Sequence, residues 1–87
     1  MGPEERKFLI EFSDVRRARE EVEIQLALGK AEAEEAFEAL ETKFQEAARK
    51  ASSLQQTARA DGTQIATAGA LLIAELKHGY QHIRTML

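Results

Sequence analysis

One apolar stripe constrains the fold of this chain more than any other feature. Its members recur in steps of three, four and four residues, and they are Val15, Ala18, Val22, Leu26, Gly29, Ala33, Phe37, Leu40, Phe44, Ala48 and Ala51. These steps average about 3.67 residues, which is close to one α-helical turn and equals an eleven-residue repeat. The stripe therefore predicts a long helix that lies against another helix.

Composition agrees with an all-α fold in a single domain, residues 1–87. The chain has 87 residues, no Cys, no Trp, one Pro and five Gly. It is rich in Ala, Glu, Leu and Gln, as helical bundles and coiled coils are. A chain of this length hides only about two-thirds of the surface that its unfolded form exposes. We therefore expect its stability to need a partner.

Charge and hydropathy argue against several classes of function. The net charge is −3 at pH 7. Each arginine of the basic cluster Arg16, Arg17 and Arg19 has a glutamate four residues later, so little positive field remains for nucleic acid. The longest apolar run, 65–76, is shorter than the roughly 20 residues that span a bilayer. Without Cys there is no disulfide framework. We expect a cytoplasmic protein that binds no nucleic acid and has no membrane span.

Start and stop signals divide the chain into a helical hairpin. Pro3, followed by two glutamates, is typical of a helix start. Asp61 and Gly62 are turn residues, and the next residue, a threonine, can cap a helix. The sequence predicts one helix over about 4–60, a turn at 61–62 and a second helix over about 63–86.

Gly29 decides between two architectures. It lies on the stripe, which keeps its phase from Leu26 to Ala33, and a glycine inside a helix costs only about 1 kcal/mol relative to alanine. We therefore predict that the first helix continues through it. The alternative is a three-helix bundle broken at Gly29 and Gly62, whose three helices have matched lengths and need no partner.

The unequal lengths of the two hairpin helices predict an oligomer. The first would be roughly 85 Å long and the second roughly 36 Å. Much of the stripe on the first helix would then have no partner within the chain, and large apolar side chains left in water attract one. Two hairpins that complete each other's bundle, as a homodimer with coiled-coil packing, are the simplest solution.

This architecture implies a non-enzymatic protein–protein interaction module, an adaptor, scaffold or small chaperone. The apolar residues expected to contact the partner are Phe8, Phe12, Val22, Leu26, Phe37, Leu40 and Phe44. The residues expected to pack the second helix against the first within the chain are Leu72, Leu76, Tyr80 and Ile83. A structural fragment of a larger protein is a further hypothesis.

A metal-binding module is the second functional hypothesis. Glu75, His78 and His82 stand at i, i+3 and i+7 on one flank of the last helix, and two histidines four residues apart can hold a divalent metal. Their simpler interpretation is as boundary residues beside the apolar face. No cofactor motif is present, since the glycines form neither a dinucleotide-binding pattern nor a phosphate loop. No serine has the neighbours of an activated nucleophile, so no enzyme is predicted.

Overall fold

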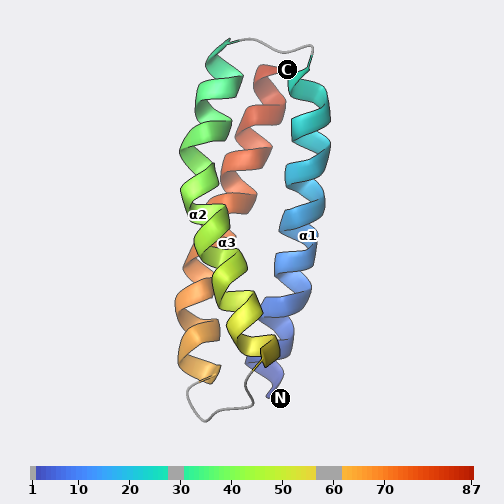
Figure 1. Ribbon diagram of the computed structural model, residues 1–87. Helices are drawn as coiled ribbons and strands as arrows, with labels where there is room; N and C mark the ends of the chain where they lie inside the picture. The colour runs from blue at the N-terminus through green and yellow to red at the C-terminus, as the bar shows by residue number, and fades with distance from the viewer. Residues whose placement is uncertain (1, 28–30, 57–61) are drawn as a thin grey trace.

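The described part of the chain is an all-α bundle of three helices of nearly equal length. The computed structural model describes residues 2–27, 31–56 and 62–87. Its elements are α1 (Pro3–Leu26), α2 (Ala31–Gln56) and α3 (Gly62–Met86), with 24, 26 and 25 residues. The chain runs up α1, down α2 and up α3, so α1 and α3 are parallel (Figure 1). The all-α prediction is confirmed.

The single helix predicted over 4–60 is wrong, and the alternative three-helix bundle describes the architecture. α1 ends at Leu26 and α2 begins at Ala31, and the two helices lie side by side (Figure 1). The molecule extends 44 Å along its longest axis, about half the length that an uninterrupted helix would need. Gly29 itself lies outside the described residues.

The second predicted boundary is nearly correct. α3 runs from Gly62 to Met86, close to the predicted 63–86. The predicted turn at 61–62 differs from the structure in one respect, because Gly62 is the first residue of α3; position 61 lies outside the described residues.

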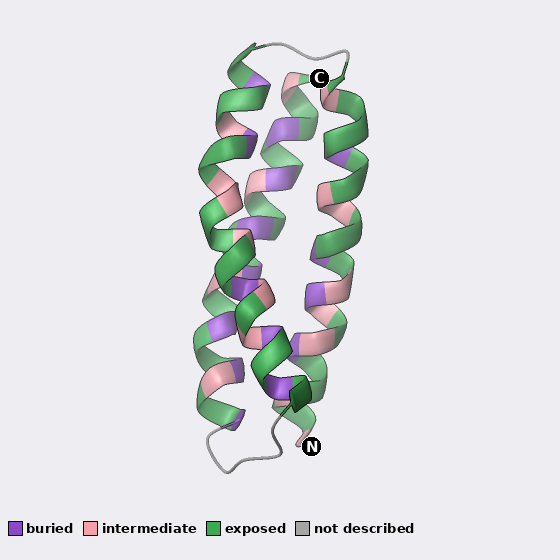
Figure 2. Ribbon diagram, viewed as in Figure 1, coloured by how far each residue is buried: buried purple, intermediate pink, exposed green. Residues whose placement is uncertain are grey.

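One apolar core runs along the axis of the bundle. In Figure 2 the buried residues of each helix face the other two helices, while exposed residues cover the outside. The largest fully buried side chains are Val15, Val22, Ile73, Leu76, Tyr80 and Ile83. Each helix therefore uses its own stripe to cover the stripes of its two neighbours.

Two glycines let α3 approach its neighbours closely. A Cβ atom built on Gly69 would lie 2.3 Å from Cε1 of Phe8 on α1. One built on Gly79 would lie 2.5 Å from Cδ1 of Leu40 on α2. α3 makes most of the interhelical contacts in the bundle, whereas α1 and α2 touch each other less.

Glu5 ties the starts of α1 and α3 together. Its carboxylate accepts a hydrogen bond from the backbone N–H of Gly2 (2.7 Å), which caps α1, and one from the hydroxyl of Thr63 on α3 (3.0 Å). These two hydrogen bonds lower the pKa of Glu5, and the bond from Gly2 has the larger effect.

Within the described residues, no helix has a stretch long and apolar enough to cross a membrane.

Candidate interaction surface

The residues predicted to contact a partner are used inside the chain. Four of the seven are buried, namely Phe8, Phe12, Val22 and Phe37. The other three are partly buried and pack against the same core, namely Leu26, Leu40 and Phe44. The premise that they lack an intramolecular partner is wrong, because α2 folds back beside α1 and α3 covers both. The reason given for a homodimer is therefore removed.

The set of α3 residues predicted to pack within the chain is confirmed. Leu76, Tyr80 and Ile83 are buried, and Leu72 is partly buried and packs against the core.

The predicted metal trio does not form a site with the other described residues. Glu75, His78 and His82 are all exposed, and Glu75 pairs with Lys43 of α2 (Nζ to Oε2, 2.6 Å). Among the residues that the structure describes, no group of three His, Cys, Asp or Glu side chains is placed to hold a metal ion. A single helix flank offers too few ligands, and in the described ranges no facing helix supplies the rest.

Two large apolar side chains are exposed on the outer faces of α1 and α3. Ile10 of α1 is 60% exposed and Leu71 of α3 is 71% exposed. Phe8 contacts Gly69 across the two helices, and Ile10 and Leu71 come two residues after them, so both side chains point away from this contact. Leu71 also lies four residues after Thr67, which lines the groove between α1 and α3, so these two side chains are neighbours on α3. We call Leu71 and this groove the α1–α3 patch.

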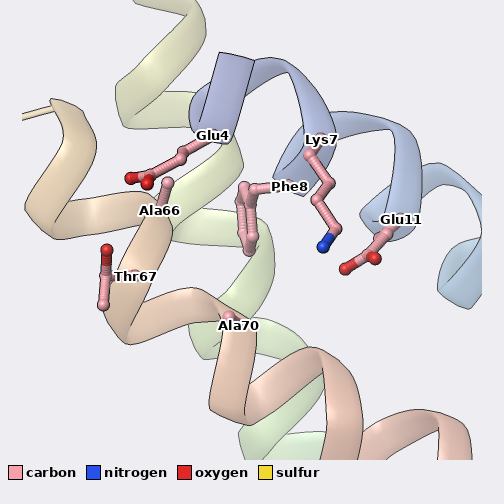
Figure 3. Close-up of a pocket in the computed structure, with 7 residues that line it drawn as sticks. All are labelled: Glu4, Lys7, Phe8, Glu11, Ala66, Thr67 and Ala70. Carbon is pink, nitrogen blue, oxygen red and sulfur yellow. The ribbon is translucent and has the colours of Figure 1, made fainter. Parts of the chain in front are cut away.

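The groove of the α1–α3 patch is small. It has a volume of about 190 Å³ and is lined by Glu4, Lys7, Phe8, Glu11, Ala66, Thr67 and Ala70. Figure 3 shows the Phe8 ring between α1 and α3, opposite the small side chains of α3. The charged side chains all come from α1, with the Lys7 ammonium and the Glu11 carboxylate pointing toward each other (Figure 3). The α3 wall is small and uncharged.

The first half of α3 carries no charge. From Gly62 to Ala74 there is no Asp, Glu, Lys, Arg or His. Several residues of this stretch are nevertheless exposed, among them Thr67, Ala70, Leu71 and Ala74. Solvent-facing helix surfaces usually carry charged residues, as the outer face of α2 does. This uncharged face therefore fits a protein contact better than it fits bulk water.

A second groove lies between α1 and α2. It has a volume of about 440 Å³ and is lined by Leu9, Phe12, Ser13, Arg16, Phe44, Ala48, Ala51, Ser52 and Gln55. The rings of Phe12 and Phe44 stack with centroids 5.6 Å apart. The groove opens where α2 presents small side chains toward α1, so the two helices leave apolar surface uncovered between them.

Arg19 makes the most extensive polar contacts in the bundle. Its Nε and Nη2 donate to the two carboxylate oxygens of Glu41 (2.7 and 2.8 Å), and its guanidinium lies 4.9 Å from the ring centroid of Phe44 and 5.4 Å from that of Phe37. The hydrogen bond to Glu41 is the main cause that raises the pKa of Arg19. A planar, always charged guanidinium suits this forked and stacked geometry. The contacts join α1 to α2 and offer no reactive group.

Of the predicted local pairs between arginines and glutamates, one is present. Arg19 contacts Glu23 (3.1 Å), whereas Glu21 pairs with Arg84 of α3. Arg16 and Arg17 form no ion pair with any residue in the described ranges.

Tyr80 combines deep burial with an unpaired hydroxyl. The residue is 1% exposed, and its hydroxyl has no hydrogen-bond partner among the described residues. Burial, more than the nearby Glu41 carboxylate, raises the pKa of Tyr80. Its ring lies 6.1 Å from that of Phe37. A phenol enclosed by core side chains is a packing element rather than an acid in a cleft.

Sequence reasoning missed the surface residues because it followed the stripe. Leu71 lies outside it, on the side of α3 away from its buried residues. The uncharged stretch from Gly62 to Ala74 is the sequence signal that could have indicated the α1–α3 patch.

Comparisons of the chain with family models, curated proteins and solved structures gave no match.

Proposed function

We propose that the protein is a non-enzymatic helical interaction module whose α1–α3 patch receives an amphipathic helix of a partner protein. The observation that carries the proposal is the position of Leu71, 71% exposed, beside the Phe8 groove and on the uncharged face of α3. Helix-in-groove recognition uses such a surface, because apolar anchors at helical spacing lie into an apolar groove.

The charges around the patch define the helix that it would accept. The α3 side carries no charge, so the part of the partner that faces it is apolar. The α1 side carries Glu4 and Glu11 around a single Lys7, so a basic residue is favoured on that flank of the partner helix. The two walls of the groove thus orient the partner helix about its own axis.

Site-specific photocrosslinking tests the proposal. A benzophenone amino acid replaces Leu71 in one variant and Ile24 in another, in cells that make the protein. Ile24 is the matched control because it is as exposed as Leu71 but lies on the outer face of α1. The proposal expects one discrete partner to be linked from position 71 and not from position 24.

The partner, once purified, gives the quantitative test. Burying a leucine side chain contributes about 1.5–3 kcal/mol, so Leu71→Asp should weaken binding by at least about tenfold. Ile24→Asp should leave the dissociation constant unchanged. Equal losses in the two variants, or no link from position 71, would overturn the proposal.

A further inference from the structure

We infer that the groove between α1 and α2 is a binding site for an aliphatic monocarboxylate, such as a free fatty acid. The acyl chain would lie along the apolar floor and the carboxylate would contact Arg16. This inference is independent of the partner helix proposed above, because the two sites lie on different faces of α1.

The floor of the groove suits an aliphatic chain. Leu9, Phe12 and Phe44 provide large apolar walls, and Ala48 and Ala51 leave the space between them open. From Phe44 to Gln55 the groove follows about 16 Å of α2, enough for an extended long-chain acyl group. The volume of about 440 Å³ lies within the range of ordinary ligand pockets.

The rim of the groove favours a headgroup with negative charge. Arg16 is the one charged residue that lines it, and Arg16 makes no ion pair within the part of the chain that the structure describes. The remaining polar lining residues, Ser13, Ser52 and Gln55, can all donate hydrogen bonds. A guanidinium binds a carboxylate through paired, charge-assisted hydrogen bonds.

The α1–α3 groove provides an internal comparison. Its rim carries the carboxylates of Glu4 and Glu11 beside Lys7, and its volume is about 190 Å³. A fatty-acid carboxylate would be repelled there and the chain would have less room. The same ligand should therefore distinguish the two grooves of one molecule.

Titration with dodecanoate, kept below its micelle concentration and followed by amide NMR spectra, tests the inference. We expect saturable shifts at groove residues such as Ser13, Ala48 and Ser52, and none centred on Leu71. Dodecyltrimethylammonium, which has the same chain and a cationic headgroup, should bind at least roughly tenfold more weakly. Equal binding of the two amphiphiles, absence of dodecanoate binding, or shifts centred on Leu71 would overturn the assignment.

Two matched variants locate the headgroup. Arg16→Gln should weaken dodecanoate binding by roughly tenfold, whereas Arg17→Gln, one position along the helix and outside the groove, should not change it. Both variants should melt like the wild type, since neither arginine is ion-paired with a described residue. If the two variants bind dodecanoate equally, Arg16 is not the headgroup contact and the inference fails.

Discussion

Gly69→Ala tests the close contact of α3 with Phe8 of α1, a residue that lines the α1–α3 groove. The added Cβ would lie 2.3 Å from Cε1 of Phe8 and 2.9 Å from Cδ1 and Cζ of the same ring. Nonbonded carbon atoms prefer separations of about 3.5–4.0 Å. Phe8 is 3% exposed and its ring is stacked near that of Phe12, so the ring can shift only toward the α1–α3 groove and at the expense of its packing.

Two opposing effects set the magnitude. Alanine in place of a helical glycine stabilises by about 1 kcal/mol through helix propensity. Overpacking a filled core typically costs about 1–3 kcal/mol, and a rigid ring at this distance places Gly69→Ala at the upper end of that range. We therefore expect a net loss of about 2 kcal/mol and a melting temperature lower by about 8–16 °C.

Thermal and urea denaturation measure the effect, and Gly79→Ala is the matched control. There the new Cβ would meet the methyl carbons of Leu40, a flexible side chain that is only partly buried. Leu40 can rotate away, so the change in unfolding free energy should stay within about 1 kcal/mol of zero.

A double variant identifies the cause. In the background of Phe8→Leu the ring atoms that oppose the new Cβ are gone, so adding Gly69→Ala should now stabilise the protein. An increase in melting temperature for Gly69→Ala alone, or the same loss with and without the Phe8 ring, would refute the packing argument.

The remaining predictions concern polar groups and assembly. Tyr80→Phe should leave stability unchanged or raise it by about 1 kcal/mol in urea denaturation, because the hydroxyl is buried without a partner. Because the pKa of Tyr80 is raised in the folded protein, the unfolded chain loses this proton first as pH rises above about 10, which favours unfolding. An alkaline melting series should therefore show a smaller loss of melting temperature in Tyr80→Phe than in the wild type. Arg19→Lys should cost about 1–2 kcal/mol in urea, because lysine cannot reproduce the fork to Glu41 or the ring contacts; Arg17→Lys should cost nothing. Glu5→Gln should destabilise at neutral pH, and because the folded pKa of Glu5 is lowered, its melting difference from the wild type should shrink as pH falls below about 4 and disappear once the folded carboxylate is protonated. Light scattering should give 9.7 kDa, the mass of one chain; a stable dimer would contradict an internally covered stripe.

The helical class could be predicted from the sequence because each helix carries a stripe with helical spacing. The error at Gly29 has a physical reason. A stripe that keeps its phase through a glycine is compatible with one helix, but two successive helices that face one core each need such a stripe too. The spacing from Leu26 to Ala33 does not distinguish the two cases.

Matched length was the better criterion. In the described ranges the three helices have almost equal length, and equal helices can cover one another along their whole extent. A hairpin with one helix more than twice as long as the other leaves apolar surface in water, which costs free energy unless a second molecule is present. A single chain that can satisfy its own stripe needs no second copy to do so.

The same reasoning explains why the candidate site could not be predicted from the stripe. The most regular apolar residues are the ones that a chain uses to fold, so most of their surface is covered by the other helices. A surface for binding comes from apolar residues outside the pattern, such as Leu71, or from places where small residues leave the stripe uncovered, such as Ala48. In a sequence, exposed apolar residues of the first kind cannot be distinguished from ordinary surface residues. The second kind depends on which helix lies opposite, which only the tertiary arrangement specifies.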